Sequence, residues 1–184
     1  MSTLQVPVSS TDHVQGDAHA PVTLVEYGDY ECPACGAAFP VVKAVQKHFG
    51  KGLRFVFRNF PLTQIHPEAE SAAETAEFAA AHGRFWEMHD MLYLRRAKWI
   101  KADDVRAFFN TCAIELGLDL AKFAKDMEGE EVAKRIATDE ERGASLGIDR
   151  TPAVFINGKR IEFSPQPEEG LRAEIDAVLG AGKR

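Results

Sequence analysis

The sequence predicts an α/β protein in which a β-α-β half and a β-β-α half are separated by a block of helices. Three observations support this fold class. An apolar run at residues 22–27 is followed by a Cys-Pro-Ala-Cys motif that opens a helical pattern. Residues 67–146 carry apolar stripes at helical spacing. Strand signals return at residues 153–156 and lead into Asn157-Gly158, the strongest two-residue hairpin signal.

The first half begins with a polar segment, residues 1–20, which we expect to be an arm. Residues 22–27 predict a buried strand, and residues 53–58 predict a second strand with partial alternation. A helix is expected between them, from Pro33 to Gly50, because proline suits the first helical turn, where its missing N–H costs nothing.

The helical block and the second half follow in order. Helices are expected over residues 67–83, 85–94, 105–116, 120–127 and 130–146. Strands at 153–156 and 160–163 form the predicted hairpin, and a last helix is expected over residues 167–179. These elements predict an arm at 1–20, a core domain made of 21–66 and 147–184, and an all-helical insertion at 67–146.

Composition and charge limit the function classes. The chain has 184 residues, enough for one domain with a sizeable core, and 45% of them are hydrophobic. The net charge is −6 and no basic cluster is longer than Arg95-Arg96, which argues against nucleic acid as a partner. No apolar stretch is long enough to cross a membrane, so no membrane partner is expected. No secretory signal is recognised, which predicts a cytoplasmic protein, or a periplasmic one if a leader has been removed.

The chemistry is expected at Cys32 and Cys35. A thiol at a helix N-terminus is stabilised as the reactive thiolate by the helix dipole and by backbone N–H groups. We therefore expect Cys32 to be the exposed nucleophile and Cys35, one turn inside, to be the buried resolving thiol. Pro33 and Ala34, between them, support the site.

Two other interpretations of the motif were weighed. A structural zinc site needs four ligands, and the remaining candidates, Cys112 and six histidines, show no paired ligand spacing, so no metal is expected. A structural disulfide is disfavoured because the motif closes too small a loop to restrict the unfolded chain. Cys112 lies on an apolar helical stripe, which favours an inert core residue.

Glu26 is out of place in a strand of valine, leucine and tyrosine. If buried, its pKa is raised by desolvation, and it could take the proton from Cys35. The alternative is that its carboxylate reaches solvent at the strand end. His66 has two interpretations as well: it stabilises a thiolate, or it is a surface or capping group.

Several motifs together resemble the DsbA-like thiol–disulfide oxidoreductases, a branch of the thioredoxin fold that carries a helical insertion. The likeness covers roughly residues 20–180. Within this family, the chain resembles the bacterial branch whose domains also occur fused to sodium/proton antiporters. The matching stretches are APVTLVEY at 20–27, ECPAC at 31–35, RNFPL at 58–62, HP at 66–67, FWEMHD at 85–90 and TPAVFING at 151–158.

The resemblance implies a thioredoxin-like α/β fold with a helical insertion, and it implies roles for individual residues. The family has a cis-proline packed against the disulfide, which would be Pro152, and the residue before it, Thr151, would pair with an extended substrate segment. The acid six residues before the first cysteine has the proton-transfer role proposed for Glu26. The Pro-Ala dipeptide departs from the Pro-His of the strongest oxidants, so the reduction potential does not follow from the resemblance.

The expected function is a thiol–disulfide oxidoreductase that exchanges a Cys32–Cys35 disulfide with protein or small-molecule thiols through a mixed disulfide. It needs no cofactor and implies a redox partner that recycles it. The alternative is a non-catalytic redox switch or chaperone-like binding module of the same fold.

Overall fold

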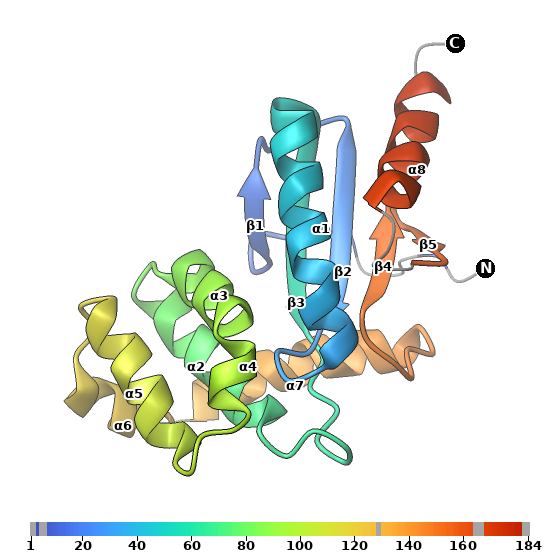
Figure 1. Cartoon of the computed structure of the whole chain (residues 1–184). Helices are drawn as coiled ribbons and strands as arrows, with labels where there is room; N and C mark the ends of the chain where they lie inside the picture. The colour runs from blue at the N-terminus through green and yellow to red at the C-terminus, as the bar shows by residue number, and fades with distance from the viewer. Residues whose placement is uncertain (1–2, 4–6, 128–129, 164–167, 182–184) are drawn as a thin grey trace. The chain divides into compact units, whose positions relative to one another are not determined.

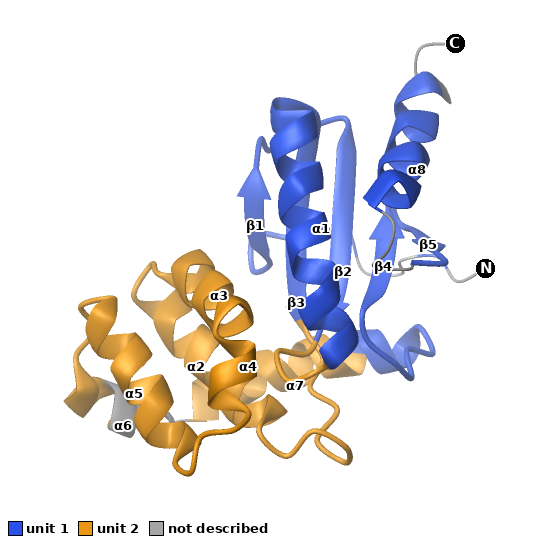
Figure 2. Ribbon diagram, viewed as in Figure 1, with its two compact units in different colours: residues 1–28, 33–58, 142–184 blue, residues 29–32, 59–141 orange. Residues whose placement is uncertain are grey.

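The computed structural model describes residues 3, 7–127, 130–163 and 168–181. The chain divides into two units, which Figure 2 colours separately. Unit 1 comprises residues 1–28, 33–58 and 142–184, and unit 2 comprises residues 29–32 and 59–141. The domain boundaries expected from the sequence stay a prediction, because the two units are defined by spatial contacts and not by independent folding.

Unit 1 contains a five-stranded sheet in the order β1-β3-β2-β4-β5. The strands are β1 (His13–Gly16), β2 (Val22–Gly28), β3 (Leu53–Asn59), β4 (Ala153–Ile156) and β5 (Lys159–Ile161). The pairs β1–β3, β2–β4 and β4–β5 are antiparallel. Nearly every residue of β2, β3 and β4 is buried, because both faces of these central strands are covered.

Two long helices pack in unit 1. Helix α1 (Pro33–Phe49) lies in front of the sheet and runs along β2 and β3 in the view of Figure 1, and a short 3₁₀ turn, η1 (Gly50–Gly52), links it to β3. Helix α8 (Glu168–Ala181) contacts both α1 and β2. Each helix buries one apolar stripe, which is why the pattern of the sequence predicted them. The buried residues of α1 and α8 are Cys35, Ala38, Phe39, Val41, Val42, Val45, Leu171 and Ile175.

Unit 2 is helical in the part of the chain that the structure describes. Its helices are α2 (Ala69–Ala81), α3 (Phe85–Leu94), α4 (Arg96–Trp99), α5 (Val105–Glu115), α6 (Leu120–Met127) and most of α7 (Glu130–Ser145). Trp99 is fully buried, its ring meets Phe109 edge to face, and its indole N–H donates to the carbonyl of Leu92 at 2.8 Å. Among the described residues no helix is long and apolar enough to cross a membrane.

Two elements were missed by the sequence analysis. The expected arm contains strand β1, which pairs with β3 so that Val14 lies opposite Val56. Its sequence, HVQG, is too short and too polar to show strand periodicity, so tertiary pairing decides its structure. Helix α4 has only four residues and likewise carries no periodic signal. The expected hairpin turn is confirmed: Asn157 and Gly158 both have positive φ, 45° and 81°.

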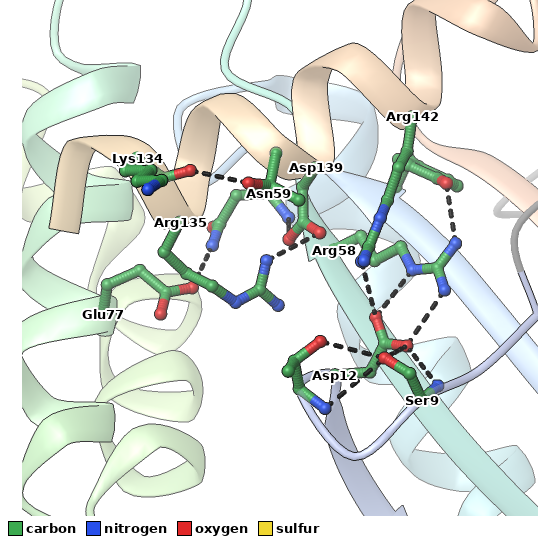
Figure 3. A network of polar contacts seen from close by, with 12 residues as sticks. Ser9, Asp12, Arg58, Asn59, Glu77, Lys134, Arg135, Asp139 and Arg142 are labelled. Atoms are coloured by element: carbon green, nitrogen blue, oxygen red, sulfur yellow. Dashed lines mark hydrogen bonds and ion pairs between the residues drawn. The ribbon is translucent and has the colours of Figure 1, made fainter. Parts of the chain in front are cut away.

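A buried ionic cluster ties the segment before β1 to the sheet of unit 1 (Figure 3). Arg58 on β3 and Asp12 have fully buried side chains, and the guanidinium Nε donates to Asp12 Oδ1 at 2.8 Å. Arg58 also donates to the hydroxyl of Tyr27 at 2.8 Å, and Arg142 lies 3.6 Å from Asp12. Burial alone would raise the pKa of Asp12, but hydrogen bonds from Arg58 and the Ser9 amide, and the charge of Arg58, hold it below its usual value.

A second cluster in Figure 3 lies within unit 2. The side-chain amide of Asn59 donates to Glu77 at 2.6 Å, and its backbone N–H donates to Asp139 at 3.1 Å. Asp139 also pairs with Arg135 at 2.7 Å. Desolvation raises the pKa of Asp139, against the opposing charge of Arg135. The cluster therefore links Asn59 to helices α2 and α7 within unit 2.

Candidate active site around the Cys32–Cys35 motif

The two cysteines of the motif lie where helix α1 begins. Cys32 directly precedes the first helical residue, Pro33, and Cys35 lies in the first turn. The two cysteines are not joined by a disulfide in this structure. Pro33 is exposed and Ala34 half-buried, so the dipeptide between the cysteines lies at the surface. This is the geometry in which a helix dipole and free N–H groups favour a thiolate.

The expectation that Cys32 is exposed is wrong in degree. Only 6% of Cys32 is accessible, against none of Cys35. Cys32 is more accessible than Cys35, as expected. The turn before the helix nevertheless holds Cys32 in a buried position. Its backbone N–H donates to both the carbonyl and the carboxylate of Asp29, each at 3.2 Å.

The turn at residues 29–31 was missed by the sequence analysis, and it contributes most of the polar contacts near Cys32. The buried Asp29 carboxylate accepts hydrogen bonds from the backbone N–H groups of Glu31, at 2.7 Å, and of Leu62, at 2.9 Å. His66 Nδ1 lies 2.7 Å from Oδ2 of Asp29, the oxygen that also accepts from Leu62. An aspartate that precedes a helix by a few residues is a recognised capping signal, and it could have identified this residue.

Helices of unit 2 hold the rest of this turn. Arg96 donates from Nε to the carbonyl of Glu31 at 2.8 Å and contacts the same oxygen through Nη2. The Glu31 carboxylate accepts from the backbone N–H of Glu68 at 2.7 Å. Tyr30 is buried, and its hydroxyl is 3.1 Å from Nδ1 of His89. The residues before Cys32 are therefore fixed on both their main-chain and side-chain atoms.

Glu26 is buried, with 3% of its surface accessible, so the alternative of a solvent-exposed strand end is excluded. It lies in β2 and pairs with Val154 of β4. Burial of this carboxyl was the condition on which its role depended. That it serves Cys35 stays a prediction.

The bond between Thr151 and Pro152 is cis, as the resemblance implied. Ala153, the next residue, pairs with Tyr27 in the antiparallel β2–β4 ladder. Pro152 therefore enters the sheet at the end of β2 from which the chain leads to the cysteine motif, and Figure 1 shows this end of β4 beside the start of α1. Thr151 is buried. Direct contact of Pro152 with Cys32 stays a prediction.

A family model described as thioredoxin matches residues 8–177, most of the chain. The chain belongs to the thioredoxin family. The whole architecture, a five-stranded sheet with a helical unit, also matches solved thioredoxin-like structures. These include oxidised BdbD from Bacillus subtilis, with a TM-score of 0.82, 22% identity and coverage of 97% of this chain and 98% of that one. A variant of α-DsbA1 from Wolbachia pipientis matches with a TM-score of 0.82, 18% identity and coverage of 97% and 94%.

Curated relatives are named Na⁺/H⁺ antiporters. NhaA 3 of Salinispora tropica is 40% identical over 98% of this chain, and NhaA 1 of Salinispora arenicola is 42% identical over 98%. The chain spans 27% of the length of each. These matches agree with the likeness to thioredoxin-fold domains that occur fused to antiporters.

The remaining cysteine of this thioredoxin-like protein differs from the motif. Cys112 on α5 is fully buried, and desolvation raises the pKa of its thiol, with partial opposition from the charge of Arg95. A raised pKa makes a thiol unreactive, as expected for a core residue. Among the residues described, no group of three or more histidines, cysteines or carboxylates could hold a metal ion.

The aromatic pair Phe85 and Trp86 lies at the start of α3. Phe85 is buried, Trp86 is half-buried, and both rings pack against His89. Both aromatic rings therefore pack within the helical unit.

Proposed function

We propose that the protein is a thiol–disulfide oxidoreductase that acts on protein or small-molecule thiols and disulfides. The observation that carries the proposal is the pair of thiols at the start of α1, one partly accessible and one buried, in a chain of the thioredoxin family. The roles follow from the geometry and from thiol chemistry.

In the reducing direction, the Cys32 thiolate attacks one sulfur of a substrate disulfide. The substrate S–S bond breaks, a Cys32–substrate disulfide forms, and the first substrate sulfur leaves as a thiolate. Cys35 then loses its proton and attacks the Cys32 sulfur. This step releases the second substrate thiolate and leaves a Cys32–Cys35 disulfide. Two electrons have passed from the protein to the substrate, and the oxidising direction is the reverse.

Glu26 is proposed to accept the proton from Cys35. A buried carboxyl is suited to this task because desolvation disfavours its charged form and brings its pKa toward neutral. Pro152 and Thr151 are proposed to face Cys32 and to offer backbone groups to an extended substrate. Pro33 and Ala34 present the surface that a substrate meets first.

A redox partner must restore the consumed form of the protein after each turnover, since the protein has two exchangeable electrons per Cys32–Cys35 pair. The cell compartment decides the direction: a reducing cytoplasm favours reduction, an oxidising periplasm favours oxidation. The cytoplasmic location expected from the sequence remains our proposal. Ion transport is the function named for the full-length antiporters, and we do not propose it for this chain.

Insulin reduction by dithiothreitol tests the proposal. The protein is expected to accelerate precipitation of the insulin B chain in catalytic amounts. No acceleration, or stoichiometric binding of zinc by the purified thiol form, would favour the alternative of a non-catalytic redox switch or binding module.

A further inference from the structure

A buried carboxylate and a histidine lie next to the reactive cysteine, outside the cysteine motif itself. The Asp29 side chain is fully buried, and the ring of His66 is 14% exposed. Asp29 Oδ2 lies 2.7 Å from His66 Nδ1, and Asp29 Oδ1 lies 3.2 Å from the backbone nitrogen of Cys32. The carboxylate therefore bridges the histidine and the main chain of the cysteine.

The hydrogen bonds to Asp29 favour one direction for its contact with His66. Asp29 accepts the backbone N–H groups of Glu31 and Cys32 on one oxygen and that of Leu62 on the other. Three N–H donors on one carboxyl favour its ionised form. An ionised carboxylate only accepts, so Nδ1 of His66 carries the hydrogen that points to Oδ2.

A carboxylate on the turn of Cys32 has two opposing effects. It fixes the backbone of the turn, and so the position of the cysteine at the start of α1. Its negative charge also disfavours a second negative charge on the Cys32 sulfur. A partner able to carry a positive charge keeps the first effect and offsets the second.

We propose that Asp29 and His66 form a positioning pair for Cys32, in which Asp29 holds the turn and His66 balances the carboxylate so that the thiolate is not repelled. The proposal rests on the proposed function and adds two residues that set the reactivity of its nucleophile. Neither residue exchanges electrons or contacts a substrate.

Other ionisable groups surround the turn and belong to the same electrostatic setting. Tyr93 of α3 donates to the Asp29 carbonyl at 3.4 Å, and His89 of α3 contacts the Tyr30 hydroxyl. Arg96 of α4 contacts the Glu31 carbonyl, and Glu31 itself bears a carboxylate. Within this setting, His66 contacts the Asp29 carboxylate through its side chain.

The test measures the thiolate of Cys32 directly, by the pH dependence of its alkylation with iodoacetamide, followed by mass spectrometry of the Cys32 peptide. The full chain with Cys35→Ser is compared with the same chain carrying His66→Ala, His66→Asn, Asp29→Asn or both Asp29→Asn and His66→Ala. His82→Asn is the matched control, because His82 is also half-buried and bonds through Nδ1, to the carbonyl of Phe78.

His66→Ala is expected to shift the midpoint of the Cys32 alkylation profile upward by about one pH unit, a tenfold change in the ratio of thiolate to thiol, because the carboxylate is left unbalanced. His66→Asn keeps a hydrogen-bond donor but cannot carry a positive charge, so it should unfold like the parent chain yet show the same loss of thiolate. In the Asp29→Asn background, His66→Ala should have no further effect. His82→Asn should leave the alkylation profile unchanged.

Folded variants with an unchanged alkylation profile would overturn the proposal. So would equal effects of His66→Ala with and without Asp29→Asn, since His66 would then act independently of the carboxylate. Alkylation reports Cys32 whether or not insulin is reduced. A failed insulin assay with coupled alkylation effects would therefore count against the proposed function and support the pair.

Discussion

At the residue scale, the three cysteines differ in their surroundings. Cys32 lies at the start of a helix and is slightly accessible, Cys35 is one turn inside, and Cys112 is buried on α5 with a raised thiol pKa. Thiol chemistry depends on thiolate character and access, so these environments predict three different reactivities.

Replacing the cysteines one at a time tests this separation. Cys32→Ser is expected to abolish insulin reduction, because no nucleophile remains to form the mixed disulfide. Cys112→Ser, the control, should keep the rate of the parent chain. Loss of activity in Cys112→Ser with the fold intact would show that the reactive thiol has been assigned to the wrong cysteine.

Glu26→Gln tests proton transfer at the residue scale. The substitution keeps the shape of the side chain and removes its ability to take a proton. We expect disulfide reduction near neutral pH to slow by about a hundredfold, the lower end of the range of general acid–base effects. The midpoint temperature of thermal unfolding should be no lower than in the parent chain, because burying the carboxyl of Glu26 costs folding free energy. Unchanged kinetics would remove Glu26 from the mechanism.

At the element scale, burial and pairing override weak local signals. Strand β1 exists because Asp12, just before it, binds Arg58 on β3, and because Gly16 allows close approach to β3. Neither reason is visible in the sequence HVQG. The long helices and β2 were predicted correctly because their apolar periodicity and flanking proline, glycine or Asn-Gly signals agree with their tertiary environment.

Asp12→Asn should destabilise the fold by about 3 kcal/mol at neutral pH, since it leaves the buried charge of Arg58 without its partner. The pKa of Asp12 is lowered in the folded state. Its contribution is therefore fully present above the unfolded value, about 3.9, and is lost as pH falls through the lower folded pKa. Urea unfolding of the two chains over a series of pH values measures the difference. A difference that does not shrink in acid would contradict the ion pair as its source.

Gly16→Ala tests the pairing of β1. Gly16 has φ of 106°, and a Cβ there would meet the carbonyl oxygen of Leu53 at 2.6 Å. We expect a loss of about 2–3 kcal/mol in the free energy of unfolding. Gly52→Ala is the control, because Gly52 has ordinary φ and open space around it, and it should change stability little. Equal effects of both substitutions would argue against close packing of β1.

At the scale of the whole molecule, the sequence predicted the thioredoxin-like fold, the helical insertion, the cis bond before Pro152 and the burial of Glu26. These followed from strong motifs and from the family resemblance. The turn at Asp29 could not be predicted with its partners, because Leu62 and His66 reach it only through the tertiary fold. The low exposure of Cys32 could not be predicted for the same reason, because its surroundings form only in the tertiary fold.

The pKa of the Cys32 thiol tests the central claim most directly. Thiolate absorbance is measured against pH in the Cys35→Ser variant, with Cys32→Ser as the blank. If Cys32 is the activated nucleophile at the start of α1, its pKa lies well below the ordinary value of about 8.5. A pKa at or above that value would contradict the account, because the helix terminus and the surrounding turn would then fail to stabilise the thiolate.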